Sequence, residues 1–423
     1  MLNEQLLYVI WKYKIFKTYP LKTISNKTVE ILHPGEHNTN SGPDFLNARI
    51  QLDSIQWAGN IEIHQKTSDF LKHQHQHDKN YHSLILHVVY EHDTTLPLPH
   101  PVEIIELKHF IAEHTIQQYN NLIKNTSSPA CIHQWNSIDN IIINNWLSRL
   151  FVQRLEQKYQ QIHQYFEQTK SYQETFYRLF CRHLGFKVNN ETFEKLAEKL
   201  PLSILLKHSD RLDLIEALIY GTAGFLNKHY KDNYLTHLQN EFEFLKKKYS
   251  IEPIEEHHWK FARMRPANFP SLRLHQLALF IHQFPKLFHD PATFFTDKNN
   301  LQKLSVTPQN YFKNHLTFDE DKFTHTTYHF GETSTHLIFI NVVIPYLFFY
   351  GKSTGNEYYQ NLALDYAEQL PAEDNAIIRK FSPASKYIQT VTHSQALLEL
   401  YPNYCEKKRC TECNIGVKIL NTE

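Results

Sequence analysis

Acidic and histidine residues concentrate near the N-terminus of the chain. Between Glu30 and Asp93 there are nine acids and nine histidines, but only four Lys or Arg residues. Carboxylate oxygens and imidazole nitrogens are common ligands of divalent metals. A metal bound by them could polarise a phosphodiester or lower the pKa of a bound water. The composition therefore predicts a metal-dependent site near the N-terminus.

Two motifs within this region are placed where strands begin and end. Pro43-Asp44 leads into a predicted strand at 45–52, and the next predicted strand, 55–64, ends in Glu62-Ile63-His64. A hairpin of these strands would bring Asp44 beside Glu62. Because side chains alternate along a strand, Glu62 and His64 share one face. We expect the two carboxylates and a third polar group to bind Mg²⁺ or Mn²⁺ at this edge of the sheet.

Pro43-Asp44, followed one strand later by Glu62-x-His64, resembles the PD-(D/E)-x-K signature of restriction-endonuclease-like nucleases. The resemblance implies that Asp44 and Glu62 hold the catalytic metal. It implies that His64 replaces the lysine, which orients the attacking water or stabilises the transition state in active members. A neutral imidazole supplies no fixed positive charge, although it can act as a base or bind a softer metal. Many members carry a glutamate on their first helix, where Glu4 lies in this chain.

The element order predicted from hydrophobic periodicity also matches that fold. Residues 4–16 have helical spacing, three strand-like segments follow, and N-cap residues at 67–69 begin a polar stretch predicted to be helical to about Asn80. Residues 84–90 are apolar and β-branched, which is typical of a central strand buried on both faces. The predicted order is therefore helix, three strands, helix, strand. The three strand-like segments are 28–32, 45–52 and 55–64.

From about residue 138 the pattern becomes helical. We therefore predict an α+β protein with a small N-terminal α/β restriction-endonuclease-like sheet domain and a large all-α C-terminal domain. The expected bounds are 1–110 for the sheet domain, 111–137 for a linker, 138–404 for the helical domain and 405–423 for a cysteine-containing tail. The predicted helices are 139–171, 173–184, 191–200, 209–226, 233–249, 271–283 and 334–350.

A second group of candidate ligands follows the Glu62-x-His64 motif. If residues 67–80 form a helix, His73 and His77 lie at i and i+4 on one face and could chelate a metal, with His75 pointing elsewhere. The alternative is a solvated helix face with scattered histidines. His87, within the predicted central strand, is expected to be a hydrogen-bonded core histidine rather than a ligand.

A wider pattern includes His73-x-His75-x2-Asp78-x2-Tyr81 and Leu86-His87-Val88-Val89. This pattern resembles an uncharacterised bacterial family of unknown function, and the likeness covers most of the chain. It implies no activity, so the mechanistic hypothesis depends on the nuclease-like motif.

A basic segment suggests a contact surface for nucleic acid. The stretch from His257 to His289 contains no acid. Arginines suit phosphate contact and the interleaved aromatic residues suit base stacking. The alternative is that these cations pair with carboxylates, including those of the N-terminal cluster. The expected contact residues are Lys260, Arg263, Arg265 and Arg273.

Three of the five cysteines lie close together near the C-terminus, in the pattern Cys405-x4-Cys410-x2-Cys413. This spacing is typical of a metal site, but a fourth ligand is missing locally. Cys131, His133 or His393 could complete a structural zinc site. The nuclease resemblance implies the second option, an iron–sulfur cluster held by Cys131 and the three C-terminal cysteines, because some nucleases of that fold fix their termini in this way. The third option is that the C-terminal cysteines are unliganded thiols in a frayed tail.

Composition bounds the remaining possibilities. The 423 residues carry 44 basic and 44 acidic side chains, so the chain is not uniformly basic. It contains no G-x-G-x-x-G or G-x4-G-K-[ST] motif. The first residues lack the basic region of a signal peptide, and the longest apolar run, 337–350, is too short to span a bilayer. We therefore expect a cytoplasmic protein without a membrane partner; the sequence does not indicate its oligomeric state.

Three functions fit these observations. The favoured one is a metal-dependent nuclease-like protein that cleaves or binds DNA or RNA. The second is a non-nuclease hydrolase with a histidine-rich metal centre that uses His64, His73, His77 or His87. The third is a catalytically inactive nucleic-acid-binding or assembly module, which the absence of a lysine at position 64 favours.

Overall fold

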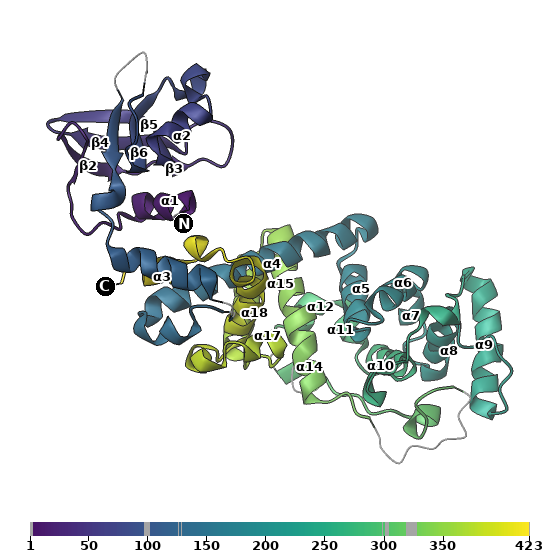
Figure 1. The fold of residues 1–423 in the computed structure, drawn as a ribbon. Helices are drawn as coiled ribbons and strands as arrows, with labels where there is room; N and C mark the ends of the chain where they lie inside the picture. Colours follow the sequence, from purple (N-terminus) through teal and green to yellow (C-terminus); the bar gives the residue numbers. More distant parts are fainter. Residues whose placement is uncertain are drawn as a thin grey trace. The chain divides into compact units, whose positions relative to one another are not determined.

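The computed structural model describes residues 3–96, 102–125, 127, 129–297, 299–300, 304–318 and 328–422 (Figure 1). The chain forms two compact units. Unit 1 comprises Met1–Leu150, Asp374–Ile388 and Ala396–Glu423, and unit 2 comprises Phe151–Glu373 and Gln389–Gln395. The division thus places the cysteine tail in the same unit as the N-terminal sheet.

Unit 1 contains the predicted sheet. The predicted order of helix, three strands, helix and strand is present. These elements are α1 (Glu4–Tyr13), β2 (Thr28–His33), β4 (Phe45–Leu52), β5 (Ile55–Lys66), α2 (Thr67–Lys72) and β6 (Leu84–Glu91). Three short strands were not predicted, namely β1 (Leu21–Lys22), β3 (Glu36–His37) and β7 (Glu103–Glu106).

The sheet is mixed, with the order β1-β2-β4-β5-β6-β7 and with β3 paired to β4. Strands β1 to β5 pair antiparallel, whereas β6 runs parallel to both β5 and β7. A parallel pair needs a crossover connection. Here α2 and two 3₁₀ turns, η1 (His75–His77) and η2 (Lys79–Tyr81), form the crossover from β5 to β6. This connection carries several of the histidines back across the end of β5.

Strand β4 contains a bulge close to its start. Phe45 pairs with Ile61 and Ala48 pairs with Gly59, so three steps along β4 match two along β5. Asn47 in the bulge has a positive φ of 57°. Phe45 and Ala48 are both buried despite their odd spacing, because the extra residue restores the inward face.

Helix α1 packs against β5. Its apolar residues Leu6, Leu7, Ile10 and Trp11 are buried, which accounts for the spacing that predicted the helix. The Asn3 side chain accepts the Gln5 backbone N–H and so begins the helix.

The rest of unit 1 is helical and includes residues 111–137, which were expected to be a linker. These residues form α3 (Glu113–Lys124) and η4 (Ile132–Ser137). Trp135 in η4 is fully buried and packs against Phe381, which precedes η9 (Ser382–Tyr387), and against Tyr387 within it. The remaining elements that lie wholly in this unit are α17 (Ala376–Arg379), η10 (Tyr401–Cys405), η11 (Cys410–Glu412) and α19 (Asn414–Leu420).

Unit 2 is built from helices, and each predicted helix is present with small differences at its ends. Helix α10 is buried on every side from Pro270 to Ile281 and packs against α8 and α5. The main helices are α5 (Tyr172–Leu184), α6 (Asn190–Lys199), α8 (Leu212–Thr222), α9 (Asn233–Tyr249), α10 (Pro270–Gln283), α14 (Glu332–Ile338), α15 (Ile344–Thr354) and α16 (Glu357–Gln369). The long α4 (Asn140–Thr169) and α18 (Val391–Leu400) contribute residues to both units.

One helix in the described part of the chain, Glu332–Thr354, is long and apolar enough to cross a membrane by length and composition alone. Its most apolar window is 72% buried inside the protein. This burial is typical of a core helix in a globular protein.

Candidate functional site

The hairpin of β4 and β5 brings Asp44 and Glu62 together. Asp44 directly precedes β4, and the pairing of Phe45 with Ile61 places it opposite Glu62. The Asp44 backbone N–H donates to Glu62 Oε2 at 3.1 Å, and the Ile63 N–H donates to Asp44 Oδ2 at 2.9 Å. Each carboxylate is thus fixed by the backbone of the neighbouring strand.

Burial disfavours the ionised forms of both carboxyl groups. Glu62 is 3% exposed, and its burial raises its pKa to about 8. Burial, with the charge of Glu62 as the next contribution, raises the pKa of Asp44 to about 7. The ion-pair partners of Glu62 in the described region are imidazoles, His64 and His75, rather than Lys or Arg. The site therefore gathers acidic groups without a fixed cation to balance them.

Helix α1 adds two further groups to this site. The Tyr8 hydroxyl donates to Asp44 Oδ1 at 2.8 Å and orients that carboxylate. Glu4 accepts the Gln65 backbone N–H, and burial raises its pKa. The charge of Glu4 acts electrostatically on both Asp44 and Glu62, so a third acid lies near the pair.

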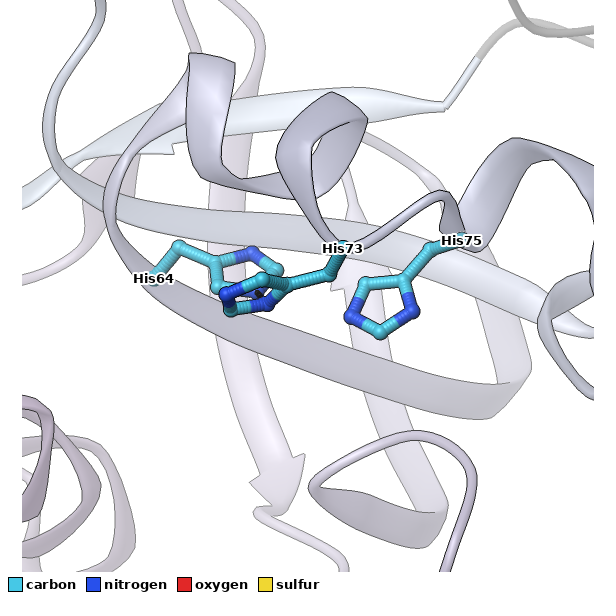
Figure 2. A group of neighbouring side chains, drawn as sticks. All are labelled: His64, His73 and His75. Carbon is cyan, nitrogen blue, oxygen red and sulfur yellow. Dashed lines mark hydrogen bonds between the residues drawn. The ribbon is translucent and has the colours of Figure 1, made fainter.

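Two histidines contact the other oxygen of Glu62, and a third histidine contacts one of these two. His64 Nε2 lies 3.4 Å and His75 Nε2 lies 3.3 Å from Glu62 Oε1. His64 Nε2 also lies 3.2 Å from His73 Nδ1. One ring nitrogen from each histidine lies within 4.8 Å of the others, a spacing that could hold a metal ion. Figure 2 shows the three rings directed toward one another from β5 and from the turn after α2.

His87 supports this group from the neighbouring strand. The parallel register pairs Glu62 with His87, and His64 Nδ1 lies 3.0 Å from His87 Nε2. This contact is a hydrogen bond only if one of the two nitrogens carries a proton. When His64 Nδ1 carries the proton, His64 Nε2 is unprotonated and its lone pair faces Glu62 and His73. Burial lowers the pKa of His64 to about 3 and that of the fully buried His87 well below its ordinary value. Both rings are therefore neutral near pH 7.

The predicted helical pair of His73 and His77 is not formed. Helix α2 ends at Lys72, His73 caps it, and Gln74 has a positive φ of 58° that reverses the chain. His75 therefore enters the site, although the helical prediction pointed it elsewhere, and His77 lies outside the trio with its side chain exposed. The residues that follow Lys72 are polar and lack apolar periodicity, so the sequence did not indicate that the helix ends there.

Tyr8 and Tyr81 are the other site residues that the prediction missed. The Tyr81 ring stacks on His75 with centroids 4.1 Å apart. The Tyr81 hydroxyl lies 3.4 Å from His75 Nε2. Tyr81 already belonged to the motif His73-x-His75-x2-Asp78-x2-Tyr81, whereas Tyr8 is identifiable only once α1 is packed on the sheet.

A hollow of about 400 Å³ in unit 1 lies next to Tyr8. Tyr8 joins it to the acid–histidine site because its hydroxyl binds Asp44. Lys12 and Arg149 provide cations in the lining, together with aromatic residues that include Phe45. The lining thus combines two cations and one acid, Glu412, with aromatic surface beside Asp44.

The predicted nucleic-acid-contact residues in unit 2 do not form one surface. Arg273 is 4% exposed and lies between the rings of Phe186 and Phe330, at 4.9 and 5.1 Å. Its guanidinium donates to Gln276 and Asn268. Arg273 is thus a core residue of α10, and its assignment as a phosphate contact is wrong because burial closes it to solvent.

Lys260, Arg263 and Arg265 are exposed, but Trp259, which directly precedes them, is not free for stacking. Trp259 is buried, donates through Nε1 to the Ala223 carbonyl and packs on Phe193. Nearby, Glu255, His257 and His258 form a second trio whose ligand atoms lie within 4.8 Å. These three residues are nearly consecutive and largely exposed.

The four cysteines considered in the sequence converge in unit 1. Cys131, Cys405, Cys410 and Cys413 line one small cavity together with Tyr404. Cys131 thus lies at the same cavity as the three C-terminal cysteines, whereas neither His133 nor His393 lines it. Cys181, on α5, is buried in the core of unit 2.

Comparison with known proteins identifies the family but no activity. A family model described as "Protein of unknown function (DUF2851)" matches residues 4–376. The chain belongs to this family. Neither a curated protein nor a solved structure matches it significantly. The DUF2851 match includes the acid–histidine site and the basic segment, while the three C-terminal cysteines lie outside the matched residues.

Proposed function

We propose that this DUF2851 protein is a metal-dependent phosphodiesterase that acts on DNA or RNA. The observation that carries the proposal is the pair Asp44 and Glu62. Asp44, half-buried just before β4, and Glu62, buried on β5, each accept a hydrogen bond from the backbone of the other segment. Buried acids placed side by side repel one another, and a divalent cation between them relieves that repulsion.

The order of the sheet elements supports a restriction-endonuclease-like assignment for the N-terminal sheet. Helix α1, antiparallel β2, β4 and β5, helix α2 and parallel β6 follow the order that the resemblance implies. Asp44 and Glu62 occupy the corresponding places on the hairpin, and Glu4 lies on the first helix near both. The nuclease assignment therefore has two supports, the motif and its structural context.

The donor set fits Mn²⁺ better than Mg²⁺. Mg²⁺ prefers oxygen ligands, whereas Mn²⁺, Fe²⁺ and Zn²⁺ also accept imidazole nitrogen. Glu62 Oε1 lies between His64 Nε2 and His75 Nε2, and Asp44 supplies a second carboxylate nearby. We propose that Asp44, Glu62, His64, His73 and His75 hold the metal.

The protein's own residues position the reacting groups. A bound divalent ion supplies Lewis acidity and a more acidic water. Tyr8 fixes Asp44, and the backbone of β4 and β5 fixes both carboxylates. His87 holds the ring of His64, a contact of the kind that orients metal ligands and raises their basicity.

His64 performs a different task from the lysine that it replaces. With its pKa lowered to about 3 by burial, it carries no charge near pH 7. It therefore cannot stabilise negative charge as a cation, but its neutral nitrogen is suited to metal binding. We propose that positive charge for the phosphate comes instead from Lys12 and Arg149, which line the hollow beside Tyr8.

Cleavage assays test this proposal. Purified protein is stripped of metal, reloaded with Mn²⁺ and incubated with supercoiled plasmid, single-stranded DNA and RNA. We expect Mn²⁺-dependent cleavage that Asp44→Asn reduces at least about 100-fold. Glu36→Gln is the matched control, because Glu36 is an exposed carboxylate on the same sheet. Equal activity of wild type and Asp44→Asn would contradict the proposal.

A histidine-rich hydrolase that is not a nuclease is the second candidate. The trio of His64, His73 and His75 favours it, because three imidazoles select transition metals. Zn²⁺ or Fe²⁺ bound in preference to Mn²⁺, with cleavage of phosphomonoesters or amides but not of nucleic acid, would support it. Salt-dependent DNA binding without turnover would instead indicate an inactive module.

We also propose a cytoplasmic location. All five cysteines are free thiols in the structure, which is typical of proteins in a reducing compartment.

A further inference from the structure

Four cysteine side chains that take no part in the acid–histidine site line one cavity in unit 1. Cys131 precedes η4, while Cys405, Cys410 and Cys413 lie on the segment that leads into α19. All four line one cavity and interact electrostatically with one another. Cys131 lies far from the other three in the sequence, so the fold rather than local spacing brings them together.

The surroundings of the four sulfur atoms suit thiolates. The backbone N–H groups of Ile415 and Gly416 donate to the Cys413 sulfur, and Lys408 acts electrostatically on Cys131, Cys405 and Cys410. Backbone amides on sulfur and a neighbouring cation both stabilise negative charge.

Close backbone packing beside these sulfurs requires a glycine. A Cβ at Gly416 would lie 2.1 Å from the Cys410 carbonyl oxygen, so α19 approaches η11 more closely than a side chain permits. At the start of α19, which Cys413 caps, the Gly416 N–H also donates to the Cys413 sulfur.

Cys413, one of the four cysteines that line the cavity, is 6% exposed. Four gathered sulfur atoms, none in a disulfide, with amide donors and a cation beside them, are the usual surroundings of a bound soft metal.

We propose that Cys131, Cys405, Cys410 and Cys413 form a tetrathiolate metal centre. The centre would tie the segment before η4 to the C-terminal segment within unit 1. It would reinforce direct contacts between the same parts of the chain, in which Lys408 Nζ donates to the Asn125 carbonyl and Gln118 donates to the Thr422 carbonyl. This site is independent of the proposed phosphodiesterase site.

The sulfur separation favours an iron–sulfur cluster over one zinc ion. Four thiolates on one zinc stand about 3.8 Å apart, since Zn–S bonds are about 2.3 Å and tetrahedral. In the described part of the chain, no three of the cysteine sulfurs lie within 4.8 Å of one another, so they stand farther apart than around one zinc. In an iron–sulfur cluster the four thiolates are shared among two or four iron atoms, so they do not all stand this close together.

Metal analysis of the full chain tests the centre. Protein purified without oxygen is assayed for iron, acid-labile sulfide and zinc, and its absorption spectrum is recorded. We expect about two or four iron atoms per chain with equal sulfide, and a broad thiolate-to-iron absorption in the visible range. The variants Cys410→Ser and Cys131→Ser should lose at least three quarters of this metal. Cys181→Ser is the matched control and should retain it, because Cys181 lies in unit 2.

The outcomes are distinct. About one zinc per chain that is lost in the same variants would support the tetrathiolate centre and assign its metal as zinc. Wild-type protein without bound metal, or metal retained in both cysteine variants, would overturn the proposal. The wild-type measurement needs no variant, so a variant that fails to fold does not leave the proposal untested. Because the assay does not measure cleavage, its result is also independent of the phosphodiesterase proposal.

Discussion

Two regions of the molecule offer the same ligand chemistry in different surroundings. The sheet cluster, which we define as Asp44, Glu62, His64, His73 and His75, is collected from two strands and a crossover turn. The loop segment, residues 255–273 of unit 2, contains the trio Glu255, His257 and His258 and the predicted phosphate-binding cations. The sheet cluster gathers its groups from separate elements and buries Glu62 and His64, whereas the loop segment pairs His257 with Glu255 in solvent and packs Arg273 into the core. Residue type alone therefore does not identify a site; convergence of separate elements with burial does.

The largest expected effect separates the two metal-compatible trios. Glu62→Gln should weaken Mn²⁺ binding at least about 100-fold, because it removes the carboxylate that two of the histidines contact. His87→Phe should weaken it about 10-fold by releasing the ring of His64. Glu255→Gln should leave the affinity unchanged. Calorimetric titration of metal-free protein measures all three, and an equal loss in Glu255→Gln would remove the distinction between the regions.

The next effect tests whether Arg273 belongs to the core. Arg273→Ala should lower the free energy of unfolding by about 3 kcal/mol, because it leaves a cavity between Phe186 and Phe330 and unpairs Gln276. Lys260→Ala, at an exposed position, should change it by less than about 0.5 kcal/mol. Urea denaturation measures both. A small effect of Arg273→Ala would return this residue to the candidate surface cations.

A pH effect of intermediate size concerns His183, which lies near Arg273. Burial and then the charge of Arg273 lower the pKa of His183 to about 3, from an ordinary value of 6.5. Between these values the unfolded chain binds a proton that the folded protein does not, so stability falls as the pH decreases from 6.5 toward 3. His183→Gln should reduce this loss by about 1 kcal/mol per pH unit. Denaturation at pH 7, 6, 5 and 4 compares it with wild type, and parallel curves would argue against a buried neutral His183.

The smallest effect concerns the exposed arginines of the loop segment. If Arg263 and Arg265 do not contact nucleic acid, the double substitution to Ala should leave the salt dependence of DNA binding unchanged. Lys12→Ala or Arg149→Ala should lower the slope by about 1 each if each neutralises one phosphate. Fluorescence anisotropy at several salt concentrations measures these slopes. A lower slope only in the Arg263 and Arg265 variant would place the nucleic-acid surface in unit 2.

Local patterns predicted much of the sheet and the first site pair. The alternation of residues 45–64 gave the hairpin, and the hairpin brought Asp44 beside Glu62. The approach of Cys131 to the C-terminal cysteines was one of several options from the sequence, because nothing local fixes a contact between segments so far apart along the chain.

The failures arise where tertiary packing decides. Assignment of a helix to residues 67–80 turned His75 away from the site, since no apolar spacing marks the reversal at Gln74. Arg273 was assigned to the surface by its charge, although its neighbours on α10 are almost all buried. Two aromatic rings compensate that charge, and they come from distant parts of the chain.

The bulge in β4 has a consequence for the evolution of this family. Asn47 restores the inward face between Phe45 and Ala48, so the number of residues in this stretch sets which side of the sheet Asp44 faces. Deletion of Asn47 would alter no acid or histidine. It would nevertheless turn each residue that precedes the bulge to the opposite face of the sheet. Changes of length are therefore less tolerable at this position than most changes of residue type, and the spacing from Asp44 to Ala48 should resist insertions and deletions.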